Sequence, residues 1–184
     1  MPSFQRVPLL QYYKNVYSRG IFSGLSRFCL LCTAVLTLSS GCSRGAHPAQ
    51  VGKSAPDFSV SDSKDSIHLA SYRGKVVVLN FWASWCGPCI QETPGLESLH
   101  HEQPDLAILG VSVDEHEDAY RQFLVRHHID MATVWDPNQT AAKLYHSEAW
   151  PETYIIDRQG VIRRKIVGDP DWTNPEIRSY LKNL

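Results

Sequence analysis

Two cysteines near the middle of the chain, Cys86 and Cys89, have the spacing that thiol chemistry requires. Two thiols three residues apart at the start of a helix can close a small disulfide ring. A cysteine attacks as its thiolate, and a helix N-terminus lowers the thiol pKa from about 8.5 to between about 3.5 and 7.5. The pair therefore predicts a redox-active dithiol, in which the more exposed Cys86 attacks and the deeper Cys89 resolves the mixed disulfide.

The residues on either side of the pair predict the strand and the helix that position it. Residues 76–82 (VVVLNFW) are a continuous apolar run, which is typical of a strand buried on both faces of a sheet. Residues 85–89 (WCGPC) then turn the chain, and residues 90–101 have helical composition. Pro88 suits a first helical turn, where its missing N–H costs nothing. Cys86 is thus expected at the helix start.

The longer string NFWASWCGPCIQETP, residues 80–94, carries a family resemblance. WCGPC is the active-site motif of the thioredoxin superfamily, and the whole string resembles its extracytoplasmic TlpA/ResA-like branch of thiol-disulfide oxidoreductases. The matching positions beyond the cysteines are Asn80, Phe81, Trp82, Trp85, Glu92 and Pro94. The resemblance implies an enzyme that exchanges its Cys86–Cys89 disulfide with protein thiols and needs no cofactor beyond that disulfide.

Glu92 is the expected third catalytic residue. It follows Cys89 by three residues and would lie one turn further along the same helix face, where a carboxyl can relay protons for the resolving thiol. In cytoplasmic thioredoxins the buried carboxylate stands six residues before the first cysteine. Asn80, which cannot titrate, occupies that position here. The alternative interpretation is a first-turn glutamate placed for the helix dipole.

A second feature of the superfamily is a proline that faces the dithiol through a cis peptide bond. The segment PETYIID, residues 151–157, resembles the stretch that carries it, which implies a cis bond before Pro151 and backbone pairing of Trp150 with an extended substrate. Trp150 departs from the small or β-branched residue common there, so its indole is expected to narrow or redirect access. The expected substrate-binding residues are Trp85, Gly87, Pro88, Trp150 and Pro151.

The rest of the body predicts an α/β fold. Strands are expected at residues 105–113, 132–135, 150–157 and 161–167, and helices at residues 115–128, 138–145 and 174–184. Asn174 and Pro175 have the types expected of a helix cap and a first helical residue. The region from Val51 to the turn at residues 73–75 resembles the N-terminal segment of TlpA-like and redoxin domains. The predicted class is a thioredoxin-like fold with an N-terminal β-hairpin, carrying residues 56–58, and an inserted βα unit.

The first 41 residues have the pattern of an export signal. They contain four basic and no acidic residues, and residues 28–38 form an apolar core of 11 residues, short of the about 20 needed to span a bilayer. The sequence LSSGC at residues 38–42 resembles a bacterial lipobox, which implies lipidation of Cys42, although Ser39 stands where the pattern prefers Leu. An ordinary cleaved signal and an uncleaved anchor remain alternatives. Residues 42–50 are the expected tether and residues 51–184 the thioredoxin-like domain.

Composition narrows the classes of partner. With 43% apolar residues the chain can bury a core without structural disulfides. Beyond Cys42 the formal charge is −5, which argues against a nucleic-acid partner.

A second CxxC, Cys29 and Cys32, falls in the signal core and is interpreted as hydrophobic filler. The histidine doublets at residues 100–101 and 127–128 point to different helix faces, so no metal site is expected.

The resemblance also implies where in the cell the protein acts and in which direction it transfers electrons. The protein is expected outside the cytoplasm of a bacterium, held to a membrane by a lipid or a signal anchor. The Gly-Pro between the cysteines is shared with reducing thioredoxins and favours a reductant, which there needs electrons from a membrane donor. The substrate that the resemblance most often implies is apocytochrome c.

Two other functions share part of the pattern. A thiol peroxidase of the peroxiredoxin type has a Pro-x-x-x-Thr-x-x-Cys loop, whereas Leu79 and Ala83 stand at those distances before Cys86. A copper-binding assembly module of the Sco-like type uses CxxxC and a distal histidine, for which His146 is the loosely placed candidate. The CxxC spacing favours the oxidoreductase.

Overall fold

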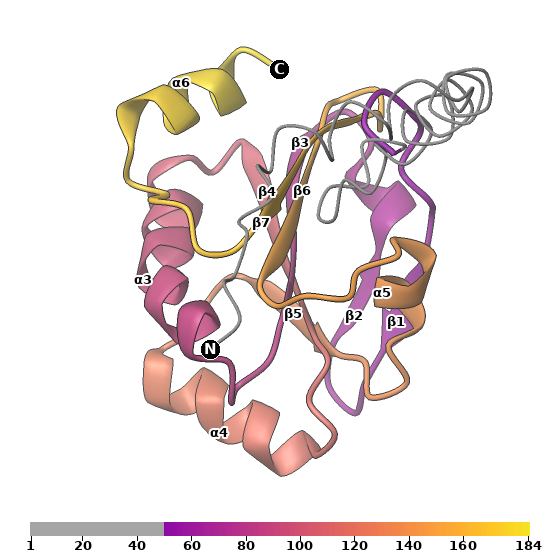
Figure 1. Cartoon of the computed structure of the whole chain (residues 1–184), viewed down its shortest axis with the longest axis vertical. Helices are drawn as coiled ribbons and strands as arrows, with labels where there is room; N and C mark the ends of the chain where they lie inside the picture. Colours follow the sequence, from indigo (N-terminus) through magenta and orange to yellow (C-terminus); the bar gives the residue numbers. More distant parts are fainter. Residues whose placement is uncertain (1–49) are drawn as a thin grey trace, which may run out of the picture. The chain divides into compact units, whose positions relative to one another are not determined.

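The strand expected before the cysteines is β3, Val76–Trp82, and it lies at the centre of a five-stranded sheet (Figure 1). All seven of its residues are buried, as the continuous apolar run predicted. The structure is a computed structural model that describes residues 50–184. The expected export signal, Cys42 and the tether up to residue 49 lie outside the described residues.

The sheet combines parallel strands with an antiparallel hairpin. Its strands, in order across the sheet, are β5 (Ala132–Trp135), β4 (Leu106–Ser112), β3, β6 (Glu152–Ile156) and β7 (Ile162–Val167). β3 pairs in parallel with β4 and β4 with β5, whereas β6 runs antiparallel to β3 and β7 antiparallel to β6. This arrangement confirms the thioredoxin-like fold, with parallel strands first along the chain and an antiparallel hairpin last.

The predicted N-terminal hairpin is present as a separate two-stranded sheet. It consists of β1 (Ser59–Ser61) and β2 (Ser66–His68), and a short 3-10 helix, η1 (Leu69–Tyr72), follows it. The expected turn at residues 73–75 contains Gly74, whose φ of 87° is a left-handed value that glycine adopts without strain.

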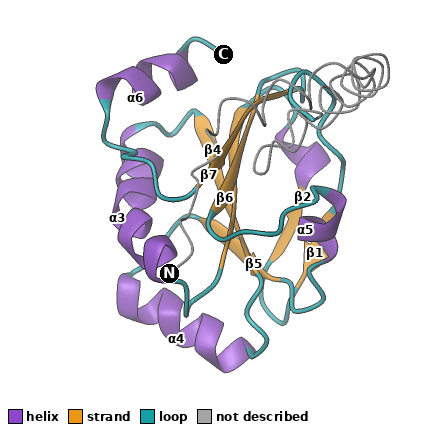
Figure 2. Cartoon of the chain, viewed as in Figure 1, coloured by secondary structure: helices purple, strands orange, loops and turns teal. Residues whose placement is uncertain are grey.

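The helices are α3 (Gly87–Glu102), α4 (Glu117–His127), α5 (Thr140–Leu144) and α6 (Pro175–Lys182) (Figure 2). α3 begins three residues before the stretch of helical composition, because Cys86 caps it and Pro88 fits its first turn. α6 begins as predicted: the Asn174 side chain accepts a hydrogen bond from the Glu176 N–H at 2.8 Å, and Pro175 is the first helical residue. α4 and α5 are shorter at both ends than expected. No helix in this part of the chain is long and apolar enough to cross a membrane.

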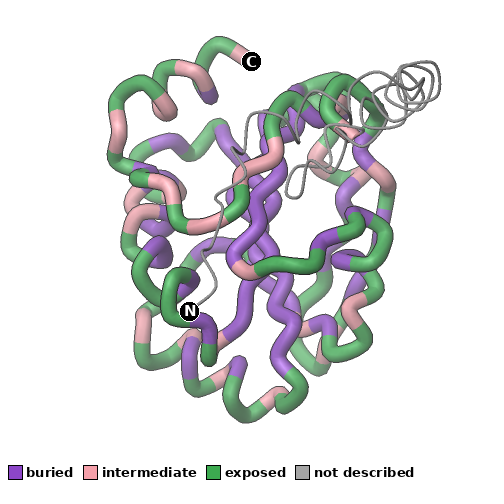
Figure 3. Tube along the Cα trace, in the orientation of Figure 1, coloured by how far each residue is buried: buried purple, intermediate pink, exposed green. Residues whose placement is uncertain are grey.

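The sheet divides the core into two layers, because alternate residues of a strand point to opposite faces. Val76 and Val78 of β3 pack in one cluster with apolar residues of α3 and α6. Val77, Leu79 and Phe81 pack in the other, with residues of α4, α5 and the hairpin. β3, β4 and β6 are accordingly buried along their whole length, whereas most of the edge strand β7 is exposed or half-buried (Figure 3). The strand that leads to the cysteines is therefore held rigidly from both sides.

Candidate active site

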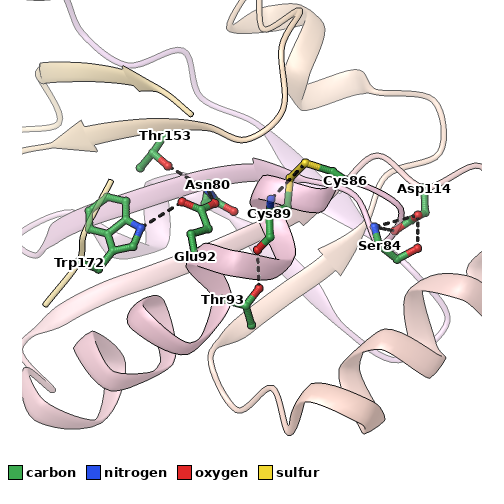
Figure 4. Close-up of a disulfide and its surroundings, with 9 residues drawn as sticks. All are labelled: Asn80, Ser84, Cys86, Cys89, Glu92, Thr93, Asp114, Thr153 and Trp172. Atoms are coloured by element: carbon green, nitrogen blue, oxygen red, sulfur yellow. Dashed lines mark hydrogen bonds between the residues drawn. A yellow bond between two sulfur atoms is a disulfide. The ribbon is translucent and has the colours of Figure 1, made fainter. Parts of the chain in front are cut away.

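Cys86 and Cys89 form a disulfide at the junction of β3 and α3, with their Cα atoms 5.2 Å apart (Figure 4). Cys86 is the N-cap of α3, and its Sγ accepts a hydrogen bond from the Cys89 N–H at 3.2 Å. An N-cap side chain normally uses an oxygen to satisfy a free N–H of the first turn. Here a sulfur takes that place, so the helix start is built to favour negative charge on Cys86.

The two cysteines differ in exposure in the predicted order. Cys86 is 5% exposed and Cys89 is 1% exposed. The side chain before them, Trp85, is 65% exposed, and Gly87 and Pro88 are exposed as well. A partner that approaches over this rim therefore meets the Cys86 side of the disulfide.

Glu92 points from α3 into the protein interior and is 4% exposed. One of its carboxyl oxygens, Oε1, accepts a hydrogen bond from Asn80 Nδ2 at 2.7 Å, and Oε2 accepts one from Trp172 Nε1 at 3.1 Å (Figure 4). Burial raises the pKa of Glu92 from its usual 4.5 to about 7, because desolvation outweighs the two hydrogen bonds that lower it. A carboxyl with this pKa can accept and return a proton near neutral pH.

Asn80 holds the Glu92 carboxyl in place from β3. Its amide nitrogen also donates to Thr153 Oγ1 of β6 at 2.9 Å, so both of its N–H groups are used. Asn80 and Thr153 are paired in the β3–β6 register, which brings them together across 73 residues of sequence. From the sequence, Asn80 was only a residue that cannot titrate; in the structure it is a donor to the residue that can.

Trp172 is a site residue that the sequence did not predict. It lies in the segment between β7 and α6, is 1% exposed, and reaches Glu92 from 80 residues away. Gly95 of α3 makes room for it: a Cβ at Gly95 would lie 3.1 Å from the Trp172 Cβ. A glycine in the middle of a helix was the available signal, because that residue costs helix stability unless something packs closely against it.

The turn before Cys86 is fixed by Asp114, which follows β4 and is 1% exposed. The Ser84 N–H donates to both Asp114 carboxyl oxygens, at 3.1 and 3.0 Å, and the Ser84 hydroxyl donates to Oδ1 at 2.7 Å (Figure 4). The Ser112 hydroxyl donates to Oδ2 at 2.7 Å. This network was not predicted, and it fixes the turn two residues before Cys86.

The peptide bond between Trp150 and Pro151 is cis, as the resemblance implied. Glu152, the first residue of β6, pairs with Phe81 near the end of β3. Pro151 therefore lies at the end of the sheet where β3 leads into the cysteine turn. Trp150 is partly buried against the core cluster that contains Cys86, so the five residues expected to bind substrate come from two segments at one end of the sheet.

His146, the residue considered for copper binding, is exposed and lies between α5 and β6. Among residues 50–184, the donor atoms that converge as a metal-binding group would come from Glu97, His101 and Asp130, and this group includes neither cysteine nor His146.

Comparison with known proteins agrees with this geometry. Residues 51–165 match the model of the AhpC/TSA family. A thiol-disulfide oxidoreductase ResA of Bacillus cereus is 31% identical over 159 residues, which cover 84% of this chain and 91% of that protein. The thioredoxin-like protein YneN of Bacillus subtilis (strain 168) is 39% identical over 124 residues, covering 65% of this chain and 72% of that one.

A solved structure extends the agreement to three dimensions. The putative thiol:disulfide interchange protein DsbE from Chlorobium tepidum superimposes with a TM-score of 0.64 at 28% sequence identity. The superposition covers 72% of this chain and 93% of that one. The strand order, the capped disulfide and these relatives thus point to the same family.

Proposed function

This chain belongs to the AhpC/TSA family and to the TlpA/ResA-like thiol-disulfide oxidoreductases of the thioredoxin superfamily, and from that premise we propose that it reduces disulfides of protein substrates outside the cytoplasm. The observation that carries the proposal is the Cys86–Cys89 pair at the start of α3, with a sulfur as the helix cap. The reacting groups are the two cysteines, and the exchange needs no cofactor beyond them.

The proposed reaction starts from the reduced pair. The Cys86 thiolate attacks one sulfur of a substrate disulfide, that S–S bond breaks, and the second substrate sulfur leaves as a thiolate that takes up a proton. Cys89 then loses its proton and attacks the Cys86 sulfur of the mixed disulfide. This step forms the Cys86–Cys89 bond and releases the other substrate thiol. Two electrons pass from the enzyme to the substrate.

In this scheme Glu92 accepts the proton that Cys89 loses. The carboxyl lies one turn beyond Cys89 on α3 and has a pKa of about 7, so a useful fraction is ionised at neutral pH. Asn80 and Trp172 act as positioning residues, since each donates to one carboxyl oxygen.

The substrate would bind as an extended segment across the exposed rim of the site. Trp85, Gly87 and Pro88 provide one side of that surface and Trp150 with Pro151 the other. Trp150 is bulky and partly buried, so we propose that it restricts which segments can approach the disulfide. Apocytochrome c, with its paired haem-attachment cysteines, is the substrate that the resemblance implies.

The direction of electron flow is the part of the proposal that a redox potential tests most directly. The Gly-Pro between the cysteines is the dipeptide of reducing thioredoxins. We expect the Cys86–Cys89 couple to equilibrate near the thioredoxin value of about −270 mV against a glutathione or dithiothreitol buffer. A potential near about −120 mV, typical of a strong oxidant, would reverse the direction. A reductant at an exported site also requires electrons from a membrane donor.

A thiol peroxidase is the second candidate, because the N-terminal segment of the domain resembles that of redoxins. Peroxide activation of that type uses a threonine three residues and a proline seven residues before the nucleophile. Ala83 and Leu79 stand there, are both 0% exposed, and have no side-chain polar atom to offer. A Sco-like copper module is the third candidate, and it would require both sulfurs as ligands.

Single cysteine variants distinguish the three functions. In a thiol-disulfide oxidoreductase, Cys89→Ser removes the resolving thiol and should trap substrates on Cys86 as adducts that a reductant releases on a non-reducing gel. Cys86→Ser is the matched control and should trap few, because its remaining thiol is deeper and lacks the helix cap. Mass spectrometry of the adducts would identify the substrates, apocytochrome c among them.

The other candidates give different results. A peroxidase would consume peroxide in the Cys89→Ser protein and leave a sulfenic acid on Cys86. A copper module would lose metal equally in both variants. Abundant adducts from Cys86→Ser and none from Cys89→Ser would reverse the assigned order of the two thiols.

A further inference from the structure

Away from the disulfide, α3 contributes to a second group of side chains with ligand chemistry. Glu97 and His101, four residues apart on α3, converge with Asp130 from the segment between α4 and β5, and we call these three residues the Glu97 cluster. One donor atom of each lies within 4.8 Å of the other two. The cluster lies roughly 15 Å along the helix from the first residue of α3.

Glu97 is the buried member of the cluster, 9% exposed. Its Oε1 accepts hydrogen bonds from the backbone N–H groups of Asp130 at 3.2 Å and Met131 at 3.3 Å. Its Oε2 is also buried, and no group in the described part of the chain donates a hydrogen bond to it. A buried carboxylate oxygen is stabilised by a hydrogen-bond donor or a cation, so this atom is available to a ligand of either kind.

His101, one of the two exposed members, lies close to both carboxylates. His101 Nε2 lies 3.7 Å from Glu97 Oε2 and 3.6 Å from Asp130 Oδ2. These separations are too long for hydrogen bonds, and exposed ion pairs of this kind contribute little to stability. They are close to what a metal ion between the atoms requires. Zinc bonds of about 2.0–2.2 Å place tetrahedral ligands roughly 3.4 Å apart.

We propose that the Glu97 cluster binds a zinc ion through Glu97 Oε2, His101 Nε2 and Asp130 Oδ2, with water as the remaining ligand. The imidazole favours Zn²⁺ over Mg²⁺ or Ca²⁺, which prefer all-oxygen sites. Two carboxylates and a neutral imidazole balance the charge of the ion. The His101 and Asp130 side chains are 59% and 70% exposed, so they can move the few tenths of an ångström that the bonds need.

The sequence predicted no metal site, because adjacent histidines of a doublet point to different faces. The Glu97 cluster uses only His101 of its doublet and takes its other ligands from Glu97 and Asp130, so the direction of His100 does not affect it. Bound zinc would join α3 to the segment that leads into β5.

Isothermal titration with ZnCl₂ tests the proposal on the full chain, produced without a histidine tag. The protein is used with the Cys86–Cys89 disulfide intact and with Cys29, Cys32 and Cys42 alkylated, so that no free thiol binds the metal. One zinc ion per chain is expected, together with a rise in melting temperature, since a ligand that binds only the folded state stabilises it.

Three variants separate this site from adventitious binding. Loss of a ligand should weaken binding at least as much as loss of an outer-shell partner does, about 10- to 100-fold. We expect this loss in His101→Gln and in Asp130→Asn, whose exposed side chain lies outside the core and can be replaced without unfolding the chain. His100→Gln, one residue away, is the matched control and should bind zinc as the unaltered chain does. Absence of saturable binding, or equal weakening by His100→Gln and His101→Gln, would overturn the proposal.

Discussion

Glu92 links the charge of one residue to the stability of the fold. Its pKa in the folded protein, about 7, lies above the 4.5 of an exposed glutamate, so the folded chain holds the proton more tightly than the unfolded chain does. The resulting stabilisation is complete below about pH 4.5 and is lost as the pH rises through 7. When the carboxyl is protonated, the shift contributes on the order of 3 kcal/mol to the free energy of unfolding.

The first prediction at the residue scale concerns Glu92→Gln in the disulfide form. A glutamine side chain cannot titrate, so the decline in the free energy of unfolding between pH 5 and pH 8 should be smaller than in the unaltered protein by about 2–3 kcal/mol. Urea unfolding at several pH values measures it. The difference between pH values is the useful quantity, because the new amide faces the Asn80 and Trp172 donors and adds a constant cost.

The same variant tests the proposed proton relay. If Glu92 accepts the proton of Cys89, Glu92→Gln should fold normally and yet exchange disulfides more slowly, or with a shifted pH profile, in a stopped-flow assay. Exchange rates that stay unchanged from pH 5 to pH 9 would exclude the relay. The alternative interpretation, a first-turn glutamate placed for the helix dipole, is wrong, because α3 begins at Gly87 and has no acidic residue in its first turn.

At the scale of elements, α3 contacts the segment between β7 and α6 as well as carrying the reacting cysteines at its start. The strand, the helix start at Cys86 and the α6 start at Asn174 could all be predicted, because each depends on neighbouring residues. The Trp172–Glu92 contact could not, since it joins residues 80 apart through tertiary packing. Local patterns also extended α4 and α5 beyond their ends, where weak propensities compete with turns.

The sequence also could not predict which distant side chains meet in the folded structure. Asp130 precedes β5 and Glu97 lies on α3, and only the packing of that segment against the helix brings them together. In the same way, the pairing of Asn80 with Thr153 depends on the β3–β6 register. Residue types and spacing identified the two thiols and Glu92, whereas the partners that orient Glu92 depend on the assembled sheet.

The prediction at this scale is that Trp172→Phe loosens the contact between the β7–α6 segment and α3. Phenylalanine lacks the indole N–H that donates a hydrogen bond to Glu92 Oε2. Its loss should raise the pKa of Glu92 above about 7. At pH 8, where the carboxylate is ionised, the free energy of unfolding should fall by about 1–3 kcal/mol for the unsatisfied oxygen, in addition to the packing loss. At pH 5 only the packing loss remains.

A double variant separates the two effects. When Glu92→Gln and Trp172→Phe are combined, no carboxylate forms, so the destabilisation caused by Trp172→Phe should be the same at pH 5 and pH 8. An equally pH-dependent loss in the Glu92→Gln background would mean that Trp172 acts through packing or another titrating group and not through Glu92.

At the scale of the whole molecule, the proposed reductant needs a means of staying near the membrane donor that we propose for it. The expected signal core of 11 apolar residues is shorter than the about 20 that span a bilayer, which favours a lipid over a spanning helix as the anchor. Cys42 follows that core in a lipobox-like sequence. A diacylglyceryl group supplies two chains, and two lipid signals are what stable anchoring requires.

The prediction for the whole molecule is therefore that Cys42 is the membrane attachment. Mass spectrometry of the mature protein should find a diacylglyceryl cysteine as its first residue, and Cys42→Ala should move the protein from the membrane fraction to the soluble fraction while its disulfide exchange is unchanged. Cys32→Ala, which alters a cysteine inside the expected signal, is the matched control and should leave the protein on the membrane. A soluble unaltered protein with an unmodified N-terminus elsewhere would exclude lipidation. Retention of Cys42→Ala on membranes would instead mean that an uncleaved signal holds the domain there.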